Sequence, residues 1–288
     1  MATSTPHVRE RGFADFSAAP PETAGGHRRW LAGAHNFWLE WIEFGEGGTA
    51  PTFESDFETI LLAPRGALHL SPADAAVHAT DILPHCACIV PAGRYAVIGD
   101  AGAACVLIAS QRGDIGGRRV LGAQSAATGA DPRVLPTGRP YRRTVSAGQI
   151  RVMDIDAIMA SRDKPRLKML QTETLSINIV EYRGARDRAA LSPHAHSEFE
   201  QGSLAITGEF VHHLRVPWSG DAGQWRDDEH LTAHSPSLLV VPVEMIHTTE
   251  GVGDGHHFLV DVFSPPRRDF IDKGWVFNSA DYAGVGAD

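Results

Sequence analysis

Short apolar runs recur along the chain between clusters of glycine, proline and aspartate. They are NFWLEWIEF, ETILLAP, CACIVPAG, ACVLIAS, SINIVEY, SLAITGEFVHHLRV, SLLVVPV and HHFLVDVF. Their length and their richness in branched and aromatic residues predict β-strands. Helical periodicity is scarce, and MDIDAIMASR (153–162) is the segment that best fits a short helix. The pattern therefore predicts an all-β sandwich or jelly roll.

The second half of the chain repeats the first. Trp41-Ile42-Glu43-Phe44 parallels Ile179-Val180-Glu181-Tyr182, residues 51–66 parallel 193–208, and residues 89–108 parallel 240–260. A tandem duplication is the simplest explanation. We therefore expect two β domains over 28–121 and 141–264. A linker rich in glycine, alanine and proline joins them over 122–140, and an extension follows over 265–288.

Composition narrows the class of protein. The 288 residues carry a formal net charge of −9 and no basic run, which argues against nucleic-acid binding. No apolar window is long enough to predict a membrane span, and the first residues show no apolar signal segment. Three cysteines, Cys86, Cys88 and Cys105, do not suggest a disulfide framework. We expect a cytoplasmic protein, with Cys86 and Cys88 buried on a strand.

Three histidines of the second half form a candidate metal site. His194 and His196 lie two residues apart, so on a strand both point to the same face. His247 follows a proline at the predicted start of a later strand. Three imidazoles that converge from neighbouring strands are typical of a site for a transition metal.

These residues resemble the two motifs of the cupin superfamily. His194-Ala-His196-SEFE-Gln201-GSLAIT-Gly208 resembles the first motif, and Pro242-Val-Glu244-Met-Ile-His247 resembles the second. Glu244 stands where the family has glycine, and the glycines and asparagine that usually flank the motifs are absent. Since both halves take part, the chain resembles a bicupin. The resemblance implies two tandem double-stranded β-helix (jelly-roll) barrels, with a degenerate first copy.

The duplication bears on the choice between Glu200 and Gln201 as fourth ligand. The first copy has Thr52, Glu54, Thr59 and Ala96 where the second has His194, His196, Gln201 and His247. It nevertheless keeps Glu58 where the second copy has Glu200. A glutamate kept without a metal suggests a structural role, such as capping a strand end or pairing with an arginine. We therefore predict Gln201 as the ligand, with Glu200 as the fallback.

The resemblance implies one divalent transition metal, Fe(II) first, with Mn, Ni, Zn or Cu as alternatives. The first function class is a dioxygenase acting on a small chelating enolic, phenolic or oxo-acid substrate. The second is a non-redox isomerase or lyase of sugar-acid or organic-acid metabolism, and the third is a non-catalytic binding protein. A site without a charged ligand favours an anionic substrate. A homodimer is expected from the family.

Several other residues are candidates near the site. Glu200, His212 and His213 are candidate catalytic residues, and alternation on a strand places only one of the two histidines inward. Glu200 and Glu244 are the carboxylates nearest in the chain for a general base. An arginine among 183–188 is a candidate for a substrate carboxylate, and a solvated loop is the alternative. Trp218 and Trp225 belong to an insertion (217–230) that covers the barrel mouth or packs against the first copy. His230, His234, His256 and His257 are expected at the surface.

Overall fold

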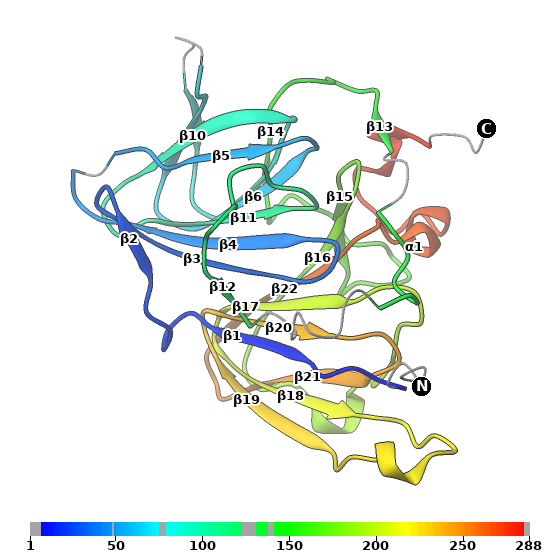
Figure 1. The fold of residues 1–288 in the computed structure, drawn as a ribbon. Coiled ribbons are helices and arrows are strands. Elements are labelled where there is room, and N and C mark those ends of the chain that lie inside the picture. Colours follow the sequence, from blue (N-terminus) through cyan, green and yellow to red (C-terminus); the bar gives the residue numbers. More distant parts are fainter. Residues whose placement is uncertain (1–6, 48, 75–78, 123–130, 138–140, 285–288) are drawn as a thin grey trace.

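The computed structural model describes residues 7–47, 49–74, 79–122, 131–137 and 141–284. Its regular elements are almost all β-strands, and each half of the chain forms a barrel from two facing sheets (Figure 1). The strands between residues 22 and 109, coloured blue to cyan, form the upper part of the molecule in this view, and the yellow and orange strands form the lower part. The predicted all-β fold with two tandem cupin-type jelly rolls is confirmed.

Two sheets enclose the first barrel. The larger sheet contains β12 (Val120–Leu121), β3 (His27–Gly33), β4 (Trp38–Phe44), β11 (Ala104–Ala109), β6 (Thr59–Arg65), β9 (Cys86–Val90) and β14 (Arg151–Asp154), with β2 (Glu22–Ala24) beside β3. The smaller sheet contains β5 (Thr52–Ser55), β10 (Gly93–Gly99), β7 (Leu68–Pro72) and β8 (Thr80–Ile82). Cys86 and Cys88 are buried in the core between these sheets, as predicted.

The second barrel has the same construction. Its larger sheet contains β1 (Gly12–Asp15), β20 (Ser237–Val241), β17 (Gln201–Thr207), β22 (His256–Phe263), β16 (Ser176–Arg183) and β15 (Lys168–Gln171), and its smaller sheet contains β19 (Glu229–His234), β18 (Glu209–Arg215) and β21 (Ile246–Val252). Outside both barrels, β13 (Arg142–Arg143) pairs with β23 (Tyr282–Ala283). Within the described residues, the helical elements are α1 (Arg268–Asp272) and the short 3₁₀ helices η2 (Arg188–Ala190), η3 (Ala222–Gln224) and η4 (Ser279–Asp281). Among the described residues, no helix is long and apolar enough to cross a membrane.

Each large sheet includes a strand from outside the predicted range of its domain. β1 precedes residue 28, yet it pairs with β20 of the second barrel, with Phe13 opposite Leu239. β14 follows residue 141, yet it pairs with β9 of the first barrel, with Val152 opposite Cys88. The predicted linker falls largely on 123–130 and 138–140, which lie outside the described residues.

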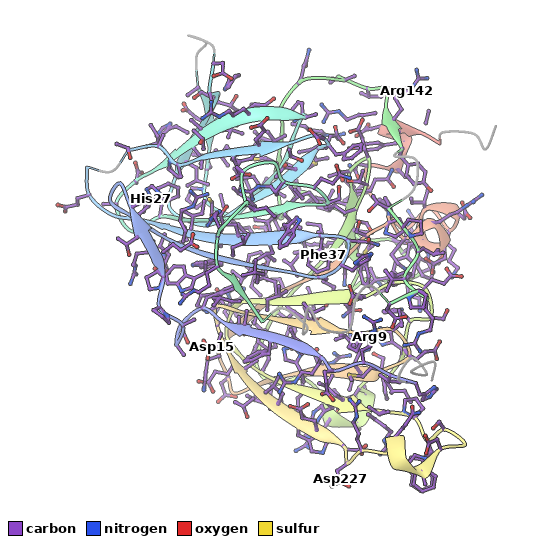
Figure 2. The ribbon with its side chains drawn as sticks, in the orientation of Figure 1. Arg9, Asp15, His27, Phe37, Arg142 and Asp227 are labelled. Carbon is purple, nitrogen blue, oxygen red and sulfur yellow. The ribbon has the colours of Figure 1, made fainter. Side chains whose placement is uncertain are left out.

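A large apolar layer joins the two halves. Leu39 and Trp41 of β4 belong to this layer, together with Ile177 and Ile179 of β16. Strands that are buried on both faces explain the continuous apolar runs of the sequence. Phe37, 1% exposed, lies between the halves (Figure 2). The halves therefore form one packed unit, which holds the walls of the second barrel in place.

The predicted helix over 153–162 is wrong. Met153 and Asp154 end strand β14, and a turn follows. In this turn the Asp154 carboxylate accepts the Asp156 backbone N–H at 2.9 Å. A short side-chain bond of this kind competes with helix formation. Ile155 and Ile158 are buried in the layer between the halves, which explains the apolar spacing.

Candidate metal centre

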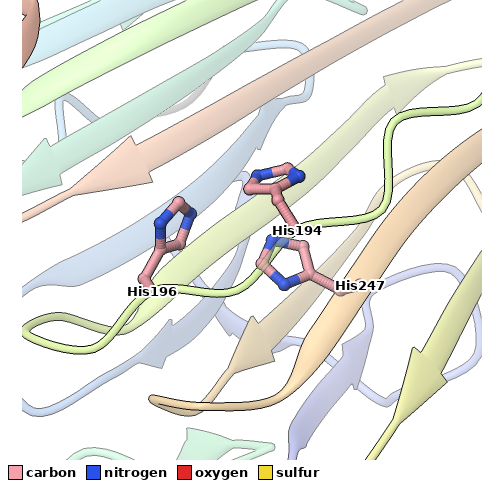
Figure 3. Close-up of side chains that lie close together, drawn as sticks. All are labelled: His194, His196 and His247. Carbon is pink, nitrogen blue, oxygen red and sulfur yellow. The ribbon is translucent and has the colours of Figure 1, made fainter.

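Three imidazoles meet in the second barrel (Figure 3). The ring centroids of His194 and His247 are 4.5 Å apart, those of His194 and His196 5.0 Å, and those of His196 and His247 5.3 Å. One nitrogen from each ring lies within 4.8 Å of the other two. The structure therefore brings together the three histidines that the sequence predicts to converge.

Backbone pairing sets this convergence. His194 and His247 form an antiparallel bridge, with N–H to O=C distances of 3.1 and 2.8 Å. The aligned residues of the first barrel, Thr52 and Ala96, are paired in the same register between β5 and β10. The two copies thus share the geometry, and the second copy carries imidazoles where the first carries a hydroxyl and a methyl group.

The prediction that His194 and His196 lie on a regular strand is wrong. Only the bridge at His194 links their segment to β21, and the next backbone bond runs from the Glu244 N–H to the His196 carbonyl at 2.7 Å. Glu244 adopts φ of 66°, whereas the aligned Gly93 continues the ladder opposite Ser55. The turn at Glu244 interrupts pairing, so the two histidines occupy an irregular segment.

We expect Glu244→Gly to raise the free energy of unfolding by about 1 kcal/mol. A left-handed conformation costs an L residue about 1–2 kcal/mol, and glycine avoids most of this cost. Glu244→Ala is the matched control because it removes the carboxylate and keeps the Cβ. Urea denaturation of both variants checks the prediction, and an equal gain in the alanine variant would show that backbone strain is not the cause.

Burial keeps two of the imidazoles neutral. It lowers the pKa of His196 to about 3 and that of His247 to about 4. Near neutral pH both rings therefore keep a lone pair for a metal. The Nδ1–H groups of His194 and His247 donate hydrogen bonds to the carbonyls of Ser192 and Met245, at 2.9 and 3.0 Å. Their Nε2 atoms therefore keep the lone pairs that can bind a metal.

Gln201 places its amide oxygen beside the imidazoles as a candidate fourth ligand atom. Its Oε1 lies 3.0 Å from Nε2 of His196 and 3.2 Å from Nε2 of His247. Its Nε2 donates to Ser203 Oγ and Asp261 Oδ1, both at 3.0 Å. Because these acceptors bind the nitrogen end of the amide, the oxygen end must face the imidazoles. Neighbouring ligands at about 2.1 Å from one ion lie about 3.0–3.4 Å apart, so this donor set fits a transition metal.

Asp261 is a site residue that sequence reasoning missed. Its carboxylate accepts bonds from Gln201, Ser203 and Asn178. Burial raises its pKa, and the bonds from Ser203 and Asn178 oppose that rise. The sequence repeat ends before this residue, and only the strand register shows that Ser203 and Asp261 pair where the first barrel pairs Leu61 and Leu107.

Glu200 points toward the first half of the molecule. Its Oε2 accepts the backbone N–H of His35 at 2.7 Å. The aligned Glu58 accepts the backbone N–H of Glu173 at 3.2 Å and pairs with Arg143 at 3.1 Å. The two glutamates therefore cross-link the halves in a nearly symmetric way, which agrees with a structural role.

His212 and His213 lie on opposite faces of β18. His212 is 1% exposed, and its Nδ1 lies 2.9 Å from the Thr249 hydroxyl. His213 faces a hollow on the other side, with contacts to His230 and Glu250 at 2.8 and 3.0 Å. Of the two candidates, only His212 lies inside the barrel wall.

The buried His212 should make stability depend on pH. Burial lowers its pKa to about 3 in the folded protein, from an ordinary 6.5. As the pH falls, the His212 imidazole therefore becomes protonated in the unfolded chain before it does in the folded protein. The free energy of unfolding is highest above pH 6.5 and decreases as the pH falls toward 3. In chelator-treated protein, His212→Gln should reduce the slope of unfolding free energy against pH by about 1.4 kcal/mol per pH unit between pH 6 and 4. Urea titrations check this, with the exposed His234→Gln as control, and an unchanged slope would contradict it.

A small cavity adjoins the imidazoles inside the barrel. It has a volume of about 80 Å³, and its wall includes His194, His247, Gln201, Arg186 and Asp261. The Arg186 guanidinium is held by the Thr249 carbonyl at 2.7 Å and the Ser192 hydroxyl at 3.0 Å. On the side of His196, an open hollow of about 520 Å³ is lined by Phe199, Arg267 and Arg268, among others. Cationic groups therefore lie on both sides of the imidazoles.

The first barrel fills the corresponding space with an ion-pair network. Glu40 is completely buried and pairs with Arg112 at 2.8 Å and with Arg29 at 2.6 Å. Burial alone would raise the pKa of Glu40, but the two arginines lower it to about 2. Glu40 occupies the register position of Asn178 in the second barrel. The first copy thus holds charge pairs where the second holds the candidate metal site.

Two expectations about peripheral residues need correction. His257 is completely buried, stacked on Tyr182 with ring centroids 5.1 Å apart, because alternation on β22 turns it inward. Trp218 and Trp225 stack on each other at 4.6 Å, and Trp218 is 75% exposed. Their loop lies at the end of the second barrel that faces away from the first barrel (Figure 1), so it does not pack against the first copy. It contacts the N-terminal segment instead, where Arg226 pairs with Glu10 at 2.9 Å.

The chain therefore has a cupin-type fold, and its second barrel contains one candidate metal centre. An oxalate decarboxylase from Lactobacillus farciminis, solved with formate, matches at 12% identity and a TM-score of 0.58, over 94% of this chain and 93% of that chain. An S161A oxalate decarboxylase from Bacillus subtilis matches at 11% and 0.56, over 91% and 80%. A putative glyoxylate-induced protein from Pseudomonas aeruginosa matches at 14% and 0.54, over 92% of each chain. No protein-family model and no curated protein matches the sequence. These likenesses establish the fold.

Proposed function

We propose that this protein is a metal-dependent enzyme that cleaves a small carboxylic acid, acting as a lyase of the decarboxylase type. The observation that carries the proposal is the 80 Å³ cavity, whose wall includes Arg186 and three of the four candidate ligands, His194, Gln201 and His247. The names of the structural neighbours support it, since two of them are oxalate decarboxylases.

In this proposal His194, His196, His247 and Gln201 hold one divalent transition metal, with iron or manganese as first candidates. When bound, the metal supplies Lewis acidity that polarises a carboxyl or carbonyl oxygen of the substrate. Asp261 keeps the oxygen of Gln201 toward the ion through its bond to the amide nitrogen. Such bonds behind a ligand typically change metal affinity 10–100-fold when removed.

Arg186 binds a carboxylate of the substrate, because its guanidinium lines the cavity and is already oriented by two hydrogen bonds. Val180, Phe210 and Leu259 form apolar wall that excludes water from the bound acid. A cavity of about 150 Å³ accommodates benzene, so a cavity of about 80 Å³ favours an acid of a few carbons over a phenolic ring. Of the substrates predicted from sequence, a small oxo-acid or dicarboxylic acid fits best.

The second candidate is a dioxygenase acting on a small oxo-acid. Its specific support is the donor set, because three imidazoles suit iron as well as the non-redox metals. Protein reconstituted separately with Fe(II) and Mn(II) should be incubated with two- to four-carbon oxo- and dicarboxylic acids. CO₂ release without O₂ uptake supports the lyase, and stoichiometric O₂ uptake supports the dioxygenase. Absence of both, with tight binding of the acid, supports a binding protein.

We expect Arg186→Gln to weaken binding of the anionic substrate about 10–100-fold and to leave the metal content unchanged. A hydrogen bond to a charged group contributes about 1.5–3 kcal/mol. Arg183→Gln is the matched control, because Arg183 ends strand β16 three residues before Arg186 and is exposed. Calorimetric titration with oxalate as probe checks the prediction. Equal affinities for the two variants would remove Arg186 from the proposed site.

A further inference from the structure

A second cluster of metal-ligating side chains lies between the two halves, away from the imidazoles of the barrel. It consists of His85, in the turn before β9, Asp156, in the turn after β14, and Glu181 on β16, with His256 on β22 beside them. We propose that His85, Asp156 and Glu181, here called the seam cluster, bind a second divalent cation, with zinc as the first candidate.

The distances within the seam cluster fit a shared ion. His85 Nε2 lies 3.2 Å from Glu181 Oε2 and 3.4 Å from Asp156 Oδ1. All three donor atoms lie within 4.8 Å of one another. Two ligands of a tetrahedral zinc ion, with bonds of about 2.0–2.1 Å, are about 3.3–3.4 Å apart. One imidazole and two carboxylates also match the ligand chemistry of zinc.

His256 orients the Glu181 carboxylate of the seam cluster. Its Nε2 lies 2.7 Å from Glu181 Oε1, the oxygen that does not face His85. This distance is that of a hydrogen bond and is shorter than the separation of two ligands on one ion. A histidine bound behind a ligating carboxylate fixes its direction, as supporting groups do in metal sites.

The backbone of His85 in the seam cluster has an unusual conformation. His85 has φ of 63°, a region that non-glycine residues rarely adopt. Its N–H donates to the Ala63 carbonyl at 2.7 Å, and its carbonyl accepts the Ile155 N–H at 3.0 Å. The second of these bonds places Asp156 beside the ring. The ring also packs against the edge of Phe258, with centroids 5.8 Å apart.

The position of the seam cluster gives the ion a structural role. Glu181 follows Ile179 of the apolar layer on the same face of β16, whereas His85 belongs to the first barrel. Asp156 is exposed, so the ion is reachable from solvent and has room for a water ligand. A cation bound here connects a turn of the first barrel to a strand of the second and stabilises their contact.

Zinc titration of the chelator-treated full-length chain, in competition with a chromophoric chelator, tests the proposal. We expect two zinc ions per wild-type chain and one in His247→Ala, which retains the seam cluster. The double variant His247→Ala/His85→Ala should bind none. Zinc should also raise the melting temperature of His247→Ala, and this rise should disappear in the double variant.

Two further variants separate ligand loss from misfolding. Asp156→Asn changes one exposed oxygen and should weaken the seam site at least tenfold in the His247→Ala background. His69→Ala is the matched control, because its imidazole pairs with Asp81 at 2.7 Å on the first barrel, outside any three-ligand cluster that the described residues form. Zinc stoichiometry that is unaffected by both His85→Ala and Asp156→Asn would overturn the seam site. A wild-type chain that binds zinc only at the seam cluster would instead contradict the proposed function. The two failures are therefore distinguishable.

Discussion

We expect the His247→Ala variant to lose at least about 1000-fold in affinity for the metal of the barrel and to remain folded. His247 is 3% exposed and supplies one of three imidazole nitrogens, so its loss exceeds the 10–100-fold effect of removing a group behind a ligand. The fold should survive because the surrounding core is apolar, with Leu214, Val241 and Met245 in one cluster. The cost in stability should be about 1–3 kcal/mol.

Metal analysis after reconstitution and dialysis, together with a thermal melt, measures both parts of this expectation. His234→Ala is the matched control, since His234 is exposed on β19, in the same sheet as His247. His194→Ala and His196→Ala should behave like His247→Ala. A variant that keeps the barrel metal would contradict the ligand assignment, and loss of the cooperative melt would mean that the metal is structural.

The second large effect concerns the charge at Gln201. Gln201→Glu should weaken binding of an anionic ligand such as oxalate by at least about 100-fold, more than it weakens metal binding. Two unit charges about 4 Å apart repel by about 4 kcal/mol at an effective dielectric constant of 20. The substitution also places a carboxylate 3.0 Å from Asp261 Oδ1, where the amide now donates a hydrogen bond. The single variant should therefore also lose stability.

The double variant Gln201→Glu/Asp261→Asn separates these two consequences. An amide at position 261 can donate to the new carboxylate, so the hydrogen bond returns with its direction reversed. We expect metal affinity and stability to recover, while oxalate binding stays weak because the added negative charge remains beside the metal. Calorimetric titrations of all three proteins measure this. Full recovery of oxalate binding in the double variant would show that geometry, and not charge, controls anion binding.

Much of the fold was predictable because its signals are local or repeated. The eight apolar runs all form strands, and SLAITGEFVHHLRV divides into two at Gly208, which has φ of 100°. The repeat also predicts the equivalence of the Thr52–Ala96 and His194–His247 pairs. By contrast, β1 and β14 are short edge strands whose partners lie far away in the chain. Their positions depend on tertiary contacts that no local pattern encodes.

The sequence predicts the candidate metal ligands better than the residues that hydrogen-bond to those ligands. Two cupin-like motifs bring His194, His196 and His247 together, and their role as metal ligands stays a prediction. Asp261 escaped notice because it sits in the apolar run HHFLVDVF, where alternation alone does not identify the partner of Gln201. The wrong expectation for His257 has a related reason, since two adjacent histidines on a strand point to opposite faces of the sheet. Which face is buried depends on the sheet that packs there.

The presence of a metal centre in the second barrel is tested most directly by the metal content of wild-type protein compared with His247→Ala, both reconstituted with Fe(II) or Mn(II) after chelator treatment. We expect the variant to contain one ion fewer per chain and to lose oxalate binding. Equal metal content in the two proteins would contradict the existence of a metal centre in the second barrel.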